Sequence, residues 1–279
     1  MKNYSILNNK ICIDNCKILE KIPELNVYAS IIDQKEPDMI MNFLEQNQRE
    51  ECYAISYLPW KHRKSVEQMF FSTHNHQVML YTLNDKPYTL VLSGENECDR
   101  ESFLELFMAG FYSYISKMET LLLHASAVTY HGESIVFVAP SGTGKTTQAE
   151  LWNSYRDALI LNGDKVFLKQ EADGIHAWGS PWKGSSPYAC NQSAPIKAII
   201  VLEQGKENQI RKLTGIEAMS RFVPHVFFPQ WDESCEAAVL SFLDIVMKEV
   251  DIYLLSCLPE EGAVDLVEQT LWPEIFLSE

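Results

Sequence analysis

The sequence has no apolar run long enough to cross a membrane. Its best apolar runs, Ile135–Ala139 and Ile196–Leu202, have the length of a strand, whereas a spanning helix needs about 20 residues. The N-terminal segment MKNYSILNNKICIDNCK also lacks the apolar core of a signal peptide. We therefore expect a soluble, cytoplasmic protein that does not bind membranes.

Basic residues are in short supply. The chain has 38 acidic residues against 23 basic ones, and its formal net charge is -15. Such a chain lacks the positive field that gathers nucleic-acid phosphates, so we expect no nucleic-acid partner. Any phosphate site must be built locally. With 46% hydrophobic residues in 279, the chain can bury one large core or two modest ones, which excludes a disordered protein.

Disulfide and zinc frameworks are also missing. The seven cysteines are an odd number and include no CxxC pair, which favours reduced thiols in a cytosolic protein. The histidines show no metal-ligand spacing beyond the pair His74 and His76. We therefore predict no zinc site.

The first hundred residues alternate short β-type runs with polar turns. The runs predict an antiparallel sheet, and its strands are Leu25–Ile32, Cys52–Leu58, Val78–Leu83 and Tyr88–Leu92. A helix then begins at Asp99, and apolar residues recur along it at helical spacing. These residues are Phe103, Phe107, Phe111, Tyr114 and Met118. We predict a β-rich domain over residues 1–98 and a second domain over residues 99–279 that includes this linking helix.

The second domain alternates strands and helices. Its predicted strands are Leu121–Tyr130, Ser134–Val138, Ala158–Leu161, Val166–Lys169, Ile175–Trp178, Pro195–Glu203 and Ile252–Cys257. Its predicted helices are Lys145–Asn153, Glu233–Lys248 and Ala263–Leu271. The fold class is therefore α/β.

The join between the second strand and the first helix of this domain carries the chemistry. The stretch APSGTGKTT is the phosphate-loop pattern, with alanine in place of its first glycine. It follows an apolar strand and opens a helix, so its amides and the helix N-terminus converge on phosphates. Lys145 can reach the β- and γ-phosphates, and the Thr146 hydroxyl can hold Mg²⁺. The predicted nucleotide-binding residues are Ser141, Gly142, Thr143, Gly144, Lys145, Thr146 and Thr147.

Asp164 is the acidic residue that can complete this site. It follows one helix and one strand after the loop, and a β-type run comes next, so its surroundings look antiparallel. An aspartate there can ligate Mg²⁺ or accept the proton of an attacking hydroxyl. The alternative is a turn residue in the corner Asn162–Asp164.

These motifs together resemble the HPr-kinase-like family. The resemblance rests on LLLHASAV, VFVAPSGTGKTT, LILNGDKV, the GSPWKG loop and APIKAIIVLE, and it covers about residues 121–271. It implies a nucleotide core similar to that of phosphoenolpyruvate carboxykinase, with a mixed, antiparallel-rich sheet. It also implies ATP- and Mg²⁺-dependent transfer of a phosphoryl group to a serine hydroxyl. Related small members occur with peptide-modification enzymes, including those of lasso peptides, which implies a ribosomal peptide as acceptor.

The resemblance also assigns residues. His124 matches the histidine on the strand before the loop, and Asp164 matches the second aspartate of the family's pair, the general base. Gly163 replaces the first aspartate, a departure that argues against reverse, phosphorylase-type activity. His124 is otherwise read as a hydrogen-bonded structural residue.

Two further residues are candidates for the chemistry. Lys183, in the GSPWKG loop, is a candidate for neutralising the transferred group, or else a solvated lysine. Glu203, at a strand end, is a candidate Mg²⁺ ligand, or else a surface group.

The sequence leaves three functions open. The first is an ATP-dependent kinase with a peptide or protein acceptor and with Lys145, Asp164, His124 and Lys183 in catalysis. The second is a kinase of a small hydroxylated metabolite. The third is a regulatory protein that binds ATP without transferring phosphate. True HPr kinases are homo-oligomers, so the resemblance leaves a homo-oligomer open as well.

Overall fold

The structure is a computed structural model. It describes residues 2–13, 17–30, 36–44, 53–54, 61–64, 68–72, 78–82, 88–93 and 99–276. Internal contacts divide the chain into two compact units. Unit 1 comprises Met1–Lys117 with Pro229–Glu236, and unit 2 comprises Met118–Phe228 with Ala237–Glu279.

Unit 1 contains one sheet with the strand order β1-β2-β3-β8-β7-β6-β5-β4. Its strands are β1 (Lys2–Ile6), β2 (Asn9–Ile13), β3 (Met39–Leu44), β4 (Tyr53–Ala54), β5 (Lys61–Lys64), β6 (Gln68–Ser72), β7 (Val78–Thr82) and β8 (Tyr88–Ser93). The predicted strands at β7 and β8 are confirmed, and they pair antiparallel. The fully antiparallel sheet is wrong, because β3 runs parallel to both β2 and β8.

The prediction of a strand over Leu25–Ile32 is also wrong for its described part. The 3₁₀ helix η2 (Pro23–Tyr28) occupies the start of this region, and a second 3₁₀ helix, η1 (Lys17–Lys21), precedes it. Pro23 stands at the first position of η2, where its fixed φ suits a helical start. Of the predicted strand Cys52–Leu58, the described residues 53–54 form β4, and the rest lies outside the described residues.

Helix α1 (Arg100–Ile115) begins where the sequence indicated. The Ser102 amide donates to the Asp99 carboxylate at 2.9 Å, which caps the helix. Phe103, Phe107 and Phe111 are fully buried along one side. Its internal contacts place this helix in unit 1, so the first break between the two units falls after the helix, at Lys117. The predicted domain boundary at residues 98/99 stays a prediction.

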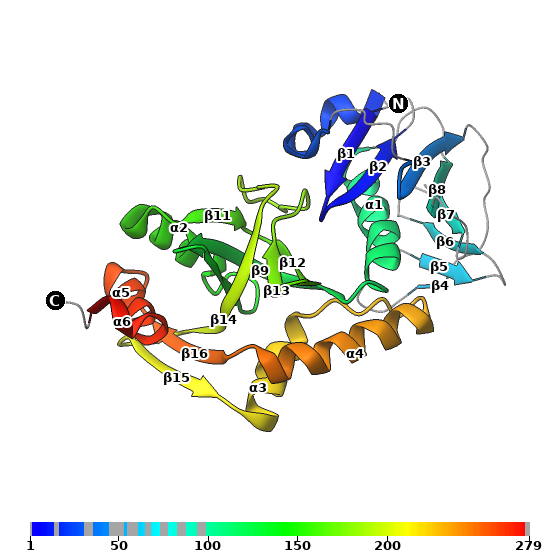
Figure 1. Ribbon diagram of the computed structural model, residues 1–279. Helices are drawn as coiled ribbons and strands as arrows, with labels where there is room; N and C mark the ends of the chain where they lie inside the picture. The colour runs from blue at the N-terminus through cyan, green and yellow to red at the C-terminus, as the bar shows by residue number, and fades with distance from the viewer. Residues whose placement is uncertain are drawn as a thin grey trace. The chain divides into compact units, whose positions relative to one another are not determined.

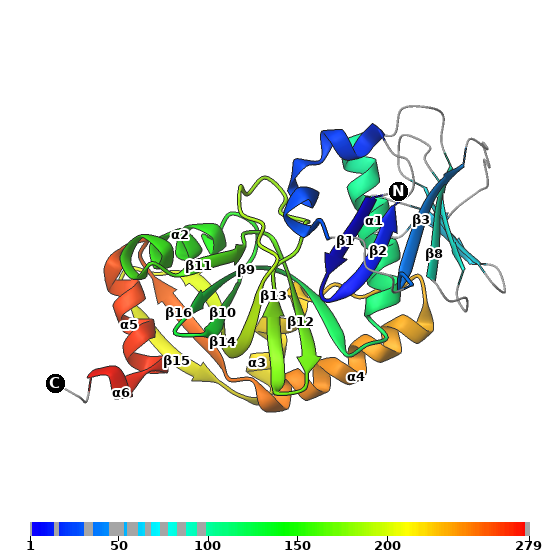
Figure 2. The ribbon, with the colours of Figure 1, turned by 45° about the horizontal axis from the view of Figure 1, so that its top comes forward.

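Unit 2 contains a mixed sheet whose strand pairings form a closed circuit, from β10 through β9, β12, β13 and β14 back to β10 (Figure 1 and Figure 2). The strands are β9 (Thr120–Tyr130), β10 (Glu133–Val138), β11 (Leu159–Asn162), β12 (Lys165–Glu171), β13 (Gly174–Trp178), β14 (Ser193–Gln204), β15 (Gln209–Leu213) and β16 (Ile252–Cys257). β14 runs parallel to β10 and β16, and the other pairs are antiparallel. The mixed α/β fold with an antiparallel-rich sheet is therefore confirmed.

The helices of this part of the chain are α2 (Lys145–Arg156), α3 (Gly215–Phe222), α4 (Glu233–Glu249), α5 (Glu261–Leu271) and α6 (Pro273–Phe276), with the 3₁₀ turn η3 (Val223–His225). Helices α2 and α5 lie together on one face of the sheet (Figure 2). Their apolar sides meet alternate residues of the strands, among them Ile135 and Phe137 of β10. This core holds the start of α2 against the end of β10.

A polar cluster joins the same two helices. Arg156 donates to Glu268 at 2.7 Å and to Asp265 at 2.5 Å, and the Tyr130 hydroxyl donates to Glu268 at 2.5 Å. Glu268 is almost fully buried, so these donors satisfy its charge.

Across the described residues, no helix is both long and apolar enough to span a membrane.

Candidate functional site

The phosphate loop connects β10 to α2, as the pattern predicted. Gly142 has a φ of 78° and Gly144 a φ of 122°, conformations that favour glycine over residues with a Cβ. Gly144 is the N-cap of α2, so the first amides of the helix point towards the concave side of the loop. A helix start of this kind attracts anions.

Lys145 opens α2 and turns its side chain back over the loop. Its Nζ donates to the carbonyls of Ala139 at 3.0 Å and Pro140 at 3.4 Å, and it lies 3.0 Å from Nε2 of His124. Burial lowers the pKa of Lys145, and the nearby Asp164 charge partly offsets this. The ammonium thus sits in the loop itself, within reach of whatever anion the amides hold.

Thr146, the second residue of α2, lines the same pocket as His124. Its hydroxyl donates to the Gly163 carbonyl at 3.0 Å, which ties the helix start to the corner between β11 and β12. The buried Ser126 hydroxyl donates to the Lys145 carbonyl at 2.7 Å. The start of α2 is therefore held by two hydrogen bonds, one from Ser126 of β9 and one to Gly163, between β11 and β12.

A single amide side chain shapes that corner. The Asn162 Oδ1 accepts from the amides of Asp164 and Lys165 at 2.8 and 2.9 Å, and its Nδ2 donates to the Ser180 carbonyl at 2.8 Å. Asn162 is fully buried. The backbone bends at Gly163 and Asp164, and this bend directs the Asp164 side chain into the pocket.

Strand pairing brings Asp164 to His124. Because Lys165 pairs with His124 between β12 and β9, the residue before Lys165 lies beside the same histidine. Nδ1 of His124 is 3.2 Å from Oδ1 of Asp164. The Lys145 ammonium has only donors, so it assigns Nε2 of His124 as the acceptor and leaves Nδ1–H to donate to Asp164.

Asp164 is ionised at neutral pH. Burial raises the pKa of its carboxyl, but the hydrogen bond from His124 and the charge and hydrogen bond of Lys165 outweigh burial and hold the pKa well below its usual range. The Lys165 Nζ donates to Oδ2 at 2.6 Å. Both carboxylate oxygens therefore have a cationic or polar donor.

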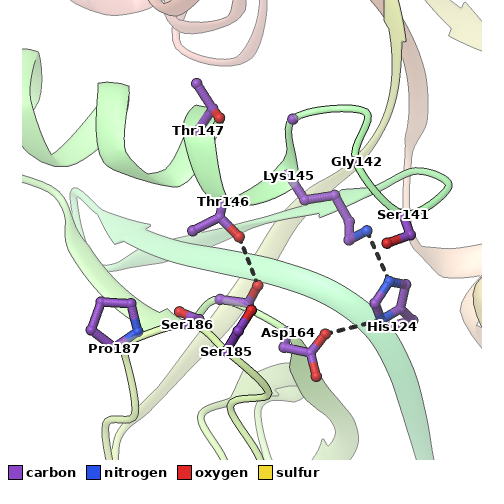
Figure 3. A pocket seen from close by; sticks show the side chains of 12 residues that line it. His124, Ser141, Gly142, Lys145, Thr146, Thr147, Asp164, Ser185, Ser186 and Pro187 are labelled. Atoms are coloured by element: carbon purple, nitrogen blue, oxygen red, sulfur yellow. Dashed lines mark hydrogen bonds and ion pairs between the residues drawn. The ribbon is translucent and has the colours of Figure 1, made fainter.

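These residues line one pocket of about 400 Å³. Figure 3 shows Lys145 and Thr146 on one side and Asp164 opposite, with His124 joined to Lys145 and Asp164 by dashed contacts. Six of the seven predicted nucleotide-binding residues line it, and they are Ser141, Gly142, Gly144, Lys145, Thr146 and Thr147. Thr143 lines a second pocket, on the other side of the loop.

Two of the predicted residues are placed elsewhere. Glu203 lines the second pocket and pairs with Arg221 at 3.2 Å, so the structure does not bring it to Thr146 and Asp164. Lys183 is not among the residues that line the first pocket. Its Nζ faces the Pro187 carbonyl at 3.5 Å.

The structure also shows site residues that sequence reasoning missed. Lys165 holds Asp164, and its position next to that aspartate was the only signal. Ser185 and Ser186 line the pocket and directly follow the GSPWKG motif, which did not single them out. His225 lines the second pocket. Burial, together with the charge of the nearby Lys145, lowers its pKa to about 4.

The donor set fits a nucleotide phosphate better than a resident metal. Among the described residues, no group of three or more His, Cys, Asp or Glu side chains could hold an ion. The amides at the start of α2, the Lys145 ammonium and the Thr146 hydroxyl are instead the groups that hold phosphates and a cation carried by them. The residues present therefore fit MgATP.

Comparisons with known proteins give a partial match. A family described as SynChlorMet cassette protein ScmC matches residues 100–233, which is less than half of the chain. No curated protein matches. The solved Hpr(Ser) kinase/phosphatase from Coxiella burnetii is similar at 11% identity with a TM-score of 0.33, over 56% of this chain and 97% of that one. A similarity this low carries no argument about activity.

Proposed function

We propose that this protein is an ATP-dependent kinase that transfers the γ-phosphoryl group to a serine-type hydroxyl of a peptide or protein in the cytoplasm. One observation carries the proposal: Lys145 and Thr146 of the phosphate loop share one pocket with an ionised aspartate, Asp164. A phosphate-binding loop by itself serves many functions. A carboxylate opposite the loop adds the group that a phosphoryl acceptor requires.

The loop residues bind and orient ATP in this proposal. The amides from Ser141 to Lys145 hold the β-phosphate, and Lys145 leaves the carbonyls of Ala139 and Pro140 to contact the phosphate oxygens. Mg²⁺, when bound, offsets the charge of the β- and γ-phosphates. Thr146 is the residue that would hold it, by releasing the Gly163 carbonyl, and Asp164 faces it from the opposite side of the same pocket.

Asp164 and His124 act on the acceptor hydroxyl. A carboxylate with so low a pKa is a weak base, so its larger contribution is to orient the hydroxyl for in-line attack, with the proton leaving late in a loose transition state. When Lys145 turns to the phosphates, Nε2 of His124 loses its donor. His124 then offers a second acceptor for that proton, held in its tautomer by Asp164.

The identity of the acceptor is argued on different grounds. The motifs quoted above resemble a group associated with peptide modification, and the family match describes a cassette protein. Both support a peptide encoded beside this protein. As part of this proposal, the nucleotide-binding core of unit 2 is similar to that of phosphoenolpyruvate carboxykinase.

The experiment is intact-mass analysis of peptides encoded by neighbouring genes after incubation with the protein, Mg²⁺ and ATP. The wild type should add one phosphate to one peptide. Asp164→Asn should keep ATP binding and slow transfer by about 10²- to 10⁴-fold, since the amide cannot accept the proton. Lys145→Ala should weaken both binding and transfer.

Exposed residues supply matched controls. Asp244→Asn and Lys206→Ala make the same changes at exposed positions and should act like the wild type. Normal transfer by Asp164→Asn would remove Asp164 from the mechanism. ATP consumed without peptide phosphorylation would point to a metabolite acceptor, and ATP bound but untouched would point to a regulatory protein.

A further inference from the structure

The loop between β13 and β14 passes close to Gly163 and Asp164, which connect β11 to β12. Its ends are tied to β11 and to each other, because the Cys190 amide donates to the Leu161 carbonyl at 3.0 Å and the Gly179 amide donates to the Gln192 carbonyl at 3.0 Å. The loop carries two adjacent serines, Ser185 and Ser186, into the pocket that holds the phosphate loop. Their placement is fixed by two close approaches.

The first approach is that of Ser186 to Gly163. A Cβ built on Gly163 would lie 2.0 Å from Oγ and 2.7 Å from Cβ of Ser186, distances that no side chain tolerates. Ser186 therefore fills the space that a side chain at position 163 would need. It is buried, its Oγ accepts from the Tyr188 amide at 3.2 Å, and its own amide donates to the Lys183 carbonyl at 3.0 Å. Ser186 is an anchor for the loop.

The second approach is that of Gly184 to Asp164. Gly184 has a φ of +57°, and a Cβ on it would lie 2.7 Å from Oδ2 of Asp164. Gly184 thus packs against the Asp164 carboxylate, and Ser186 packs against Gly163. Ser185, between them, is exposed and lines the pocket with Lys145, Thr146 and Asp164. Figure 3 shows its side chain between Ser186 and Asp164.

We propose that Ser185 is a site of self-phosphorylation. The inference rests on the proposed kinase function, since it takes ATP as the donor. The Ser185 Oγ forms a bond to the γ-phosphorus, the bond from that phosphorus to the β,γ-bridging oxygen breaks, and ADP leaves. The hydroxyl proton passes to Asp164 or His124. The chain thereby presents a serine hydroxyl at the place where an external acceptor must bind.

The reaction is intramolecular. The serine and the phosphate loop belong to one pocket of one chain, so the local concentration of the hydroxyl does not depend on the protein concentration. The rate constant of self-phosphorylation should therefore stay constant when the protein is diluted about tenfold. A Lys145→Ala chain mixed with active wild type should gain no phosphate.

The test incubates the full chain with Mg²⁺ and ATP and no acceptor, and follows both ADP release and intact protein mass. The wild type should gain one phosphate, located at Ser185 by peptide fragmentation. Ser185→Ala should gain none, Ser185→Thr should gain phosphothreonine, which shows that the loop still folds, and Ser154→Ala, at an exposed position of α2, should act like the wild type.

Several outcomes would overturn the inference. ADP release without phosphate on the wild-type chain would refute self-phosphorylation and leave the kinase proposal standing. Phosphate at another residue, or unchanged labelling of Ser185→Ala, would refute the site. Absence of both ADP and phosphoprotein, even with candidate peptides added, would refute this inference together with the proposed function.

Discussion

At the scale of single residues, the site consists of a chain of polar contacts that runs from Lys145 through His124 to Asp164 and Lys165. Each member has its role set by its neighbours. The ammonium assigns the tautomer of the histidine, and the second lysine keeps the carboxylate ionised. A short sequence motif supplies the first member, and strand pairing supplies the other three.

His225 gives a pH-dependent prediction at this scale. Its pKa is about 4 in the folded protein, against an ordinary value of 6.5. Between these values the unfolded chain binds a proton that the folded chain does not, so the free energy of unfolding rises with pH. The effect should be on the order of 2 kcal/mol, after allowance for partial exposure.

Urea unfolding of wild type and His225→Gln at about pH 7.5 and about pH 5 measures this effect. The wild type should lose more stability than the variant on going to the lower pH. His131→Gln, at an exposed position, is the control and should keep the wild-type difference. Equal losses in wild type and His225→Gln would show that His225 does not carry the effect.

Residue patterns alone indicated the phosphate loop, whereas the other residues of the candidate site depend on contacts between distant parts of the chain. Ser141–Thr147 form a local motif whose geometry depends on adjacent residues alone. Asp164 was singled out because it follows one helix and one strand after the loop, and the β-type run after it is β12, which pairs antiparallel with β9. The link between Glu203 and this pocket did not form, because Arg221 of α3, a helix absent from the prediction, pairs with Glu203.

At the scale of elements, the sequence predicts where a strand or helix begins and ends better than it predicts which strands pair. The predicted bounds of the β9, β10, α2, β12 and β13 segments match those observed to within a few residues, because apolar alternation and capping are local. β15 was missed since its sequence, QIRKL, is mostly polar and largely exposed. The parallel pairs around β3 could not be predicted, because alternation does not specify which strands are neighbours.

Ser186, on the loop between β13 and β14, packs against Gly163, between β11 and β12. This contact gives a prediction about protein stability. Gly163→Ala adds a methyl group where the Ser186 side chain lies, and overpacking of this kind costs about 1–3 kcal/mol. Ser186→Gly removes the obstacle and a hydrogen bond worth about 1 kcal/mol. The double variant should therefore be more stable than the sum of the two single losses predicts.

Urea unfolding of the four proteins in this cycle measures the coupling. Gly262→Ala is the control, because its methyl would meet the end of the Asn208 side chain at 3.1 Å and the Glu260 carboxylate at 3.7 Å, and its effect should be independent of Ser186→Gly. Strict additivity for Gly163→Ala and Ser186→Gly would contradict the packing described here.

At the scale of the whole molecule, the chain passes from one unit to the other three times, after Lys117, after Phe228 and after Glu236. The candidate site lies wholly within unit 2. A ligand of this site binds the folded unit and not the unfolded chain, so its binding free energy adds to the stability of that unit. Nucleotide should therefore raise the unfolding temperature, and the rise should grow with the logarithm of its concentration divided by its dissociation constant.

MgATP at about 100 times its dissociation constant should stabilise the site by about 2.7 kcal/mol. For a protein of this size that corresponds to a rise of roughly 5–10 °C in the unfolding temperature. Differential scanning fluorimetry of wild type, Lys145→Ala and the exposed control Lys206→Ala measures it. The control should keep the full rise, whereas Lys145→Ala should lose most of it, because its loop lacks the ammonium that Ala139 and Pro140 now hold. An equal rise in all three proteins would place the nucleotide somewhere other than this loop.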